Sequence, residues 1–133
     1  MKKTKFNEGF TVVEVLIVLG IISILASIAI PSVTRLINQA KATKIVTEMQ
    51  NVQVAVMNYG IYNSTLSGVT FDALLSDGYL TSQPENIEIV KDSSTPLEIR
   101  IVYDGDSPTA TELKKINNNI LIDNDTAYLV VKY

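Results

Sequence analysis

Glu14 is the most informative residue for chemistry, because it is the one charged side chain in an apolar run of 21 residues from Phe10 to Ile30. As a helix this run spans roughly 31 Å, the thickness of the hydrocarbon core of a bilayer. We therefore predict a membrane-spanning helix. A carboxylate in such a helix costs about 2.5–3.5 kcal/mol at the bilayer centre and somewhat less near one end, so Glu14 is expected to have a function and a charged partner.

Three lysines, Lys2, Lys3 and Lys5, precede the apolar run and predict a cytoplasmic amino end, with the rest of the chain exported. An ordinary secretory signal is the alternative interpretation, and Ser27-Ile28-Ala29 would be its cleavage site. The tract is longer than the usual apolar region of a signal peptide, and an early acidic residue would only impair one.

The amino-terminal pattern resembles the type IV filament proteins, the pilins and pseudopilins. The resemblance covers about the first fifty residues, and Val12 departs mildly from it because leucine is commoner there. It implies that a prepilin peptidase cuts between Gly9 and Phe10 and that the new terminus at Phe10 is N-methylated. It also implies a helix break between Gly20 and Pro31 in the filament. The residues that carry the resemblance are Lys2, Lys3, Lys5, Gly9, Phe10, Thr11, Glu14, Gly20 and Pro31.

Such a cleavage would expose a cationic amino group at Phe10, one helical turn before Glu14. If Glu14 met the amine of a neighbouring copy, two poorly solvated charges would be neutralised and the axial stagger of the copies would be set. Pairing with the chain's own amine, or extension of Glu14 to the membrane interface, is the alternative. We expect Glu14 to act in filament assembly.

Composition makes enzyme chemistry unpromising, because the chain has neither cysteine nor histidine. This excludes disulfides and thiolate metal sites and removes the commonest general base. We expect no enzyme, no cofactor and no metal. Two acidic turns, Asp104-Gly105-Asp106 and Asp123-Asn124-Asp125, resemble fragments of calcium loops but lack the full ligand spacing, so we interpret them as turns.

The exported part is acidic: from Ile45 to Tyr133 it carries five Lys/Arg against twelve Asp/Glu. Direct nucleic-acid binding is therefore not expected. Arg35, Lys41 and Lys44 follow the apolar run, where they would meet lipid head groups or form a solvated helix face.

The helix is predicted to continue beyond the membrane, with a kink at Pro31 and a second weak point at Gly20. Its apolar positions recur at spacings of three and four, which indicates one buried face. A loop is expected from Asn58 to Gly68. The predicted buried face consists of Ile45, Met49, Val52, Val56 and Tyr59.

The remaining residues predict two short helices and two hairpins. Thr70 is expected to cap a short helix that runs through Ser76 and is ended by Gly78. Thr109 and Glu112 are expected to form a capping box for a second short helix, which runs to about Asn117. The first hairpin is expected to join a strand at Ile87–Ile89 to a strand at 97–103 through a turn at Asp92–Pro96. The second hairpin is expected to join a strand at 120–123 to a strand at 127–132 through a turn at Asn124-Asp125. The fold class is α+β: a long amino-terminal helix packed on an antiparallel sheet of three or four strands, as in pilins.

We thus divide the chain into a removed leader (1–9), a transmembrane and filament-core helix (10–30), an amphipathic helix (31–59) and a head (60–133). The function implied is that of a type IV pilus subunit, anchored in the inner membrane with the head outside the cytoplasm and then polymerised into an extracellular filament. A pseudopilin for secretion or DNA uptake, and a solitary membrane-anchored binding domain, are the alternatives. The partners implied are other copies and other pilins, the prepilin peptidase, an inner-membrane assembly platform and, before assembly, membrane lipid.

Overall fold

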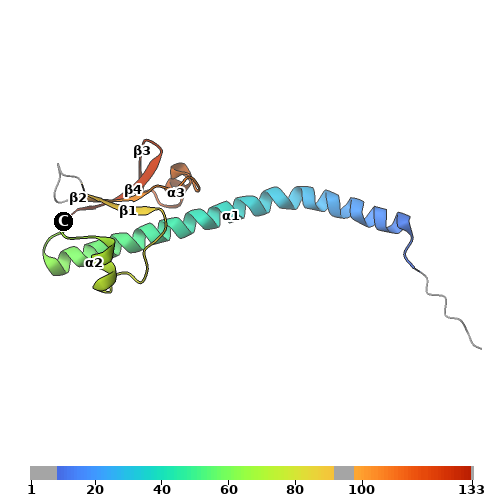
Figure 1. Ribbon diagram of the computed structural model, residues 1–133. Coiled ribbons are helices and arrows are strands. Elements are labelled where there is room, and N and C mark those ends of the chain that lie inside the picture. Colours follow the sequence, from blue (N-terminus) through green and yellow to red (C-terminus); the bar gives the residue numbers. More distant parts are fainter. Residues whose placement is uncertain (1–8, 92–97, 133) are drawn as a thin grey trace, which may run out of the picture. The chain divides into compact units, whose positions relative to one another are not determined.

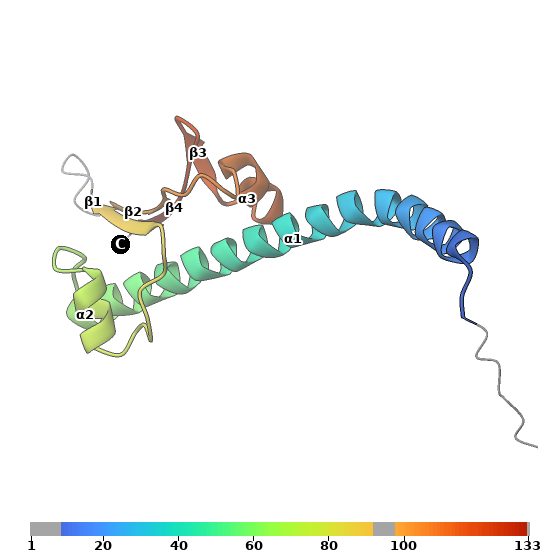
Figure 2. The same cartoon turned by 45° about the vertical axis from the view of Figure 1, so that its right-hand side comes forward.

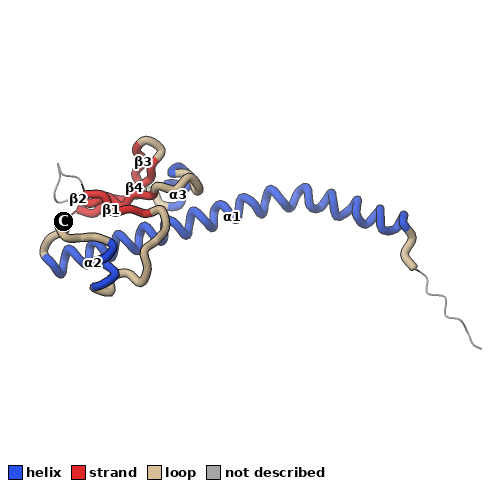
Figure 3. Tube along the Cα trace, viewed as in Figure 1, coloured by secondary structure: helices blue, strands red, loops and turns tan. Residues whose placement is uncertain are grey.

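The computed structural model describes residues 9–91 and 98–132 (Figure 1). The chain divides after Ile37 into two units. We call residues up to Ile37 the amino-terminal unit and residues from Asn38 onward the head. The helices of the described residues are α1 (Val12–Asn63), α2 (Phe71–Ser76) and α3 (Ala110–Ile116). The strands are β1 (Ile87–Lys91), β2 (Glu98–Tyr103), β3 (Leu121–Asp123) and β4 (Thr126–Lys132) (Figure 3).

The amino-terminal unit consists of the first half of α1. Its apolar side chains lie on the surface of the helix, and α1 is long and apolar enough to cross a membrane by length and composition. Gly20 and Pro31 both lie inside the continuous helix. The helix break between them therefore stays a prediction for the assembled filament.

The head contains the core of the protein, which forms where the second half of α1 packs against the sheet (Figure 2). The predicted apolar face of this helix is confirmed: Met49, Val52 and Val56 are buried, while Ile45 and Tyr59 are partly buried against the same core. Every buried apolar residue of the described chain lies between Ala42 and Val131.

The end of α1 corrects the sequence-based prediction. A loop was expected from Asn58, but the helix continues to Asn63, whose side-chain amide donates to the carbonyl of Tyr59 at 3.1 Å. Gly60, inside the expected loop, is instead a buried residue of this helix. The chain leaves the helix at Ser64, which adopts a left-handed φ of 56°.

The sheet has four antiparallel strands in the order β1-β2-β4-β3. Both predicted hairpins are confirmed, although the turn expected at Asp92–Pro96 lies outside the described residues. The alternation predicted for β2 is also confirmed, since Ile99, Ile101 and Tyr103 are buried. The α+β class with a long amino-terminal helix on an antiparallel sheet is thus the observed fold, and it is pilin-like.

Both short helices begin where their capping residues predict. The Thr70 side chain accepts a hydrogen bond from the N–H of Ala73, and Gly78 follows α2 with a φ of 76°. Thr109 and Glu112 form a reciprocal capping box at the start of α3. These caps satisfy backbone donors that a helix leaves without partners in its first turn.

Candidate functional site at the amino terminus

The predicted cleavage site lies just before the first helical residue. Gly9, Phe10 and Thr11 have no regular secondary structure and are exposed, and α1 begins at Val12. A side chain at position 9 would meet no atom within 4 Å. The described part of the chain therefore leaves room for a side chain at this position.

Thr11 and Glu14 form a capping box at the start of α1. The N–H of Thr11 donates to Oε2 of Glu14 at 2.8 Å, and the N–H of Glu14 donates to Oγ1 of Thr11 at 3.2 Å. Two donors that a helix amino terminus leaves without partners are thereby satisfied. Sequence reasoning missed this contact, although its signal, a threonine followed three residues later by a glutamate, stands in the sequence and was used for Thr109 and Glu112.

The capping box gives Glu14 a partner in the uncleaved chain. A carboxylate has two oxygens, and the Thr11 bond uses Oε2. The negative charge also lies beside the positive end of the helix dipole, which stabilises it. Glu14 is therefore held in a defined position next to Phe10 before any amine is exposed there.

The hydroxyl groups of the apolar tract bond to the helix itself. Ser23 Oγ donates to the carbonyl of Leu19 and Ser27 Oγ to that of Ile24, both at 2.7 Å. Within a bilayer no water is available, so a hydroxyl bonded inside its own helix is the arrangement that lipid tolerates. These bonds suit the tract to a lipid environment.

Gly20 and Pro31 are exposed residues inside α1. A side chain at position 20 would meet no atom within 4 Å, and Pro31 supplies no N–H for the carbonyl of Ser27. Both residues lower the free energy needed to open the helix locally. The resemblance implies that the helix unwinds between these two residues in the filament, and this stays a prediction.

The basic residues after the tract lie on exposed helix surface. Arg35 lies in the amino-terminal unit and Lys41 in the head, and both are exposed. Lys44 is 74% exposed and pairs with Glu48 one turn later at 3.6 Å. An exposed pair at this spacing is typical of a solvated helix face and contributes little to stability.

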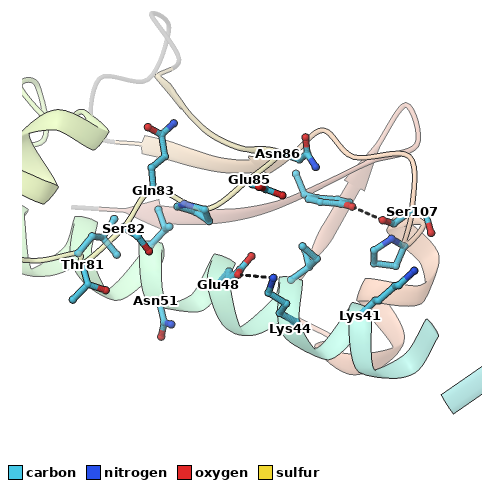
Figure 4. A pocket seen from close by; sticks show the side chains of 16 residues that line it. Lys41, Lys44, Glu48, Asn51, Thr81, Ser82, Gln83, Glu85, Asn86 and Ser107 are labelled. Carbon is cyan, nitrogen blue, oxygen red and sulfur yellow. Dashed lines mark hydrogen bonds and ion pairs between the residues drawn. The ribbon is translucent and has the colours of Figure 1, made fainter. Parts of the chain in front are cut away.

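A groove of about 500 Å³ lies in the head between α1 and the segment 80–86 (Figure 4). Its polar contacts join residues that are close in sequence: Lys44 pairs with Glu48, and Tyr103 donates its hydroxyl to the carbonyl of Ser107 at 2.9 Å. Burial raises the pKa of Tyr103, with a smaller contribution from Asp106. Polar residues around the groove include Lys41, Asn51, Thr81, Ser82, Gln83, Glu85 and Asn86.

Of the two acidic segments, Asp123-Asn124-Asp125 takes the backbone conformation of a turn. Asn124 and Asp125 have φ values of 46° and 61° between β3 and β4, the left-handed conformation that a two-residue hairpin loop needs. Gly105 lies so close to the Tyr103 ring that a side chain there would overlap with it. Within residues 9–91 and 98–132, no three Asp or Glu residues come together as metal ligands.

Comparison with known proteins supports the amino-terminal assignment. Residues 4–30 match the family model of the prokaryotic N-terminal methylation motif. Among curated proteins and among solved structures, none matches the chain. The matched residues contain the Gly9–Phe10 bond, the Thr11–Glu14 capping box and the whole apolar run from Phe10 to Ile30. The chain therefore carries the leader signature of the type IV pilins and pseudopilins, joined to a pilin-like α+β fold.

Proposed function

We propose that this chain is the structural subunit of a type IV pilus. The observation that carries the proposal is the apolar first half of α1, whose large side chains are about half exposed or more, from Val15 at 48% to Val12 at 76%. No part of the described chain covers this surface. It needs lipid before assembly and the helices of other subunits afterwards.

Processing starts the sequence of events. A prepilin peptidase cuts between Gly9 and Phe10, the new amine of Phe10 is methylated, and the leader (1–9) is lost. The N-methylation motif over residues 4–30 supports this step. The remaining chain then comprises a membrane and filament-core helix (10–30), an amphipathic helix (31–59) and a head (60–133).

Assembly then uses the charge of Glu14. When a subunit leaves the membrane for the filament core, its carboxylate approaches the amine of a neighbour's Phe10 and cancels it. The pair sets the stagger of adjacent helices, because separating two opposite charges in a medium of low dielectric is costly. Gly20 and Pro31 permit the helix to unwind where the bundle requires it.

The partners follow from this sequence of events. They are other copies of the chain, other pilins, the prepilin peptidase and an inner-membrane assembly platform, with lipid around the tract before assembly. The head lies outside the cytoplasm, and the final location is an extracellular filament. The family signature is that of structural proteins, which agrees with a subunit that is no enzyme.

A pseudopilin of a secretion or DNA-uptake system is the second candidate, because the same leader signature serves both. The two are separated by deleting the gene and measuring surface filaments, protein secretion and transformation in parallel. Loss of filaments alone supports the pilus, while loss of secretion or transformation with unchanged filaments supports the pseudopilus. A solitary anchored domain would change none of these and would stay in the membrane.

A further inference from the structure

β1 is an edge strand whose outer side is open. It pairs with β2 on one side, and the N–H of Asp104 donates to the carbonyl of Asn86 at 2.9 Å at the start of this pairing. Because bonding alternates along an antiparallel pair, the N–H and C=O groups of Ile87, Ile89 and Lys91 point away from β2. Within residues 9–91 and 98–132, no other backbone group bonds to them. We call this side of β1 the open edge.

The opposite edge of the sheet offers much less backbone for pairing. β3 has three residues, and by the same alternation Ile122 is the one whose backbone groups point outward. Beyond the end of β3, the carbonyl of Val130 in β4 accepts a hydrogen bond from the side chain of Gln53 at 3.2 Å. An uncovered edge is a template for pairing with another chain, and in the described head the open edge is the longer one.

A groove of about 520 Å³ lies beside the open edge, between β1 and the segment 69–71. Its apolar surface comes from Val69, which is buried, and from Phe71 and Ile89, which are partly buried. At the end of β1, Nζ of Lys91 donates to the carbonyl of Ser67 at 2.8 Å. A strand added to the open edge would point every second side chain toward this groove, because opposite residues of paired strands share a face.

The groove continues into an acidic one at the start of β1. This second groove, of about 580 Å³, shares Gln83, Ile87 and Glu88 with the first. Glu85, Glu88 and Asp104 line it and are exposed. In the part of the chain that the structure describes, no ion pair involves these three carboxylates. A basic residue at this end of an added strand would complement their charge.

We propose that the open edge binds an extended segment of another protein, which adds to the sheet antiparallel to β1. The backbone of the segment bonds to the open edge, and apolar residues at every second position enter the groove beside it. Antiparallel pairing, which is the more stable kind, brings the carboxyl end of the segment to the acidic groove, so that end is basic. All these residues lie in the head, and the inference does not depend on filament formation.

A synthetic peptide tests the proposed chemistry on the full chain in lipid nanodiscs. The probe is a fluorescent, amidated octapeptide of alternating threonine and valine whose last two residues are lysines. We expect saturable binding by fluorescence anisotropy, and about tenfold weaker binding when the two lysines stand at the amino end instead. No binding of the probe, or equal affinity of the two peptides, would contradict the proposal.

Backbone methylation of the probe separates strand addition from attraction by charge. The valines, whose side chains enter the groove, are the residues that exchange hydrogen bonds with β1. N-methyl groups on the three valines should therefore abolish binding, because they remove the donors and crowd the open edge. The same groups on the three threonines lie at the far side of the added strand and should be tolerated. Equal effects of the two sets would overturn strand addition.

Variants of the chain locate the site. Glu88→Lys reverses a charge beside the open edge and should weaken binding of the probe about tenfold. Asp123→Lys makes the same reversal at the opposite edge of the sheet and should leave binding unchanged. Unchanged affinity of Glu88→Lys would place the probe elsewhere.

A second copy of the chain is the other occupant that the experiment can detect. The chain has no cysteine of its own, so Glu88→Cys introduces a single thiol next to the open edge. We expect no disulfide-linked pairs from this variant under mild oxidation without the probe. Linked pairs would show that two open edges meet each other and would reject a segment of another protein as the occupant.

Discussion

Thr11 and Glu14 bond to each other in both directions: each backbone N–H donates to the other's side-chain oxygen, at 2.8 Å and 3.2 Å. In the uncleaved chain this capping box gives two backbone N–H groups at the start of α1 an acceptor, and it holds the Glu14 carboxylate one helical turn from Phe10. Cleavage before Phe10 would add a positive amine next to this carboxylate. The residue proposed to pair with a neighbour is thus already positioned by its own helix.

Thr11→Val tests this positioning role. Valine keeps the shape of threonine but gives the N–H of Glu14 no acceptor, and a lost helix cap costs about 1 kcal/mol. We expect normal cleavage and a moderate fall in filament yield, smaller than that caused by neutralising Glu14. Thr11→Ser retains the hydroxyl and is the control. Equal yields from the Val and Ser variants would exclude a role for the cap in assembly.

Gly9→Val should block removal of the leader. A branched side chain crowds the extended backbone at the bond to be cut, while the described structure leaves free space at this position. Immunoblots should show the full-length precursor in the membrane, with Gly9→Ala processed at least in part. Efficient cleavage of Gly9→Val would place the processing site elsewhere, for example after Ala29 as in an ordinary secretory signal.

The head expressed from Ala42 should fold as a soluble monomer without metal, because its buried core lies between Ala42 and Val131. With no cysteine to cross-link it, its free energy of unfolding should fall toward the low end of the usual range, about 5 kcal/mol. Urea unfolding and light scattering measure both properties. A substantial rise in melting temperature with calcium would mean that the acidic turns bind the ion.

The stability of the same head should depend on Glu112 and on pH. A hydrogen bond from the backbone N–H of Thr109 lowers the pKa of Glu112 from its ordinary value of 4.5, helped by the Thr109 hydroxyl. The charged carboxylate therefore stabilises the fold above the ordinary pKa, and this contribution is lost as the pH falls through the lowered value. Parent and Glu112→Gln should differ in urea midpoint at about pH 7 and converge at about pH 2. A difference that does not change with pH would argue against the charged cap.

Local patterns predicted most of the elements, and contacts between distant residues account for what was missed. The caps at Thr70 and Thr109 and the two hairpins are set by neighbours in sequence. The pairing of β2 with β4, with Ile101 opposite Leu129, joins distant residues and has no local signal. The strand order could not be predicted for this reason.

The end of α1 shows the same limit. Glycine is a poor helix former, yet Gly60 lies buried inside α1. The helix there packs on a core that other elements of the head supply, and no local pattern indicates this. Gln53 donates a hydrogen bond to the carbonyl of Val130 in β4 at 3.2 Å. The two residues are 77 positions apart in sequence, so no local pattern indicates this contact. At the amino terminus the resemblance predicted roles for Gly9, Phe10 and Glu14. The capping role of Glu14 was missed, although Thr11 and Glu14 have the same spacing as Thr109 and Glu112.

Glu14→Gln separates charge from shape in assembly. Glutamine keeps the size and hydrogen-bonding capacity of glutamate but cannot cancel a neighbour's amine, and an unpaired buried charge costs about 3–5 kcal/mol. We expect normal cleavage at Gly9, membrane insertion at least as efficient as in the parent, and few or no filaments. Glu14→Asp, which keeps the charge, should retain more filaments than Glu14→Gln. Normal filament number and length in Glu14→Gln would rule out the charge-pair mechanism.

The most direct test of the central claim is the composition of filaments sheared from the cell surface. Electron microscopy should show filaments, and the intact mass of their subunit should correspond to this chain beginning at Phe10 with one added methyl group. The account is contradicted if the chain remains in the membrane fraction and is absent from the sheared filaments, or if its mass shows cleavage after Ala29.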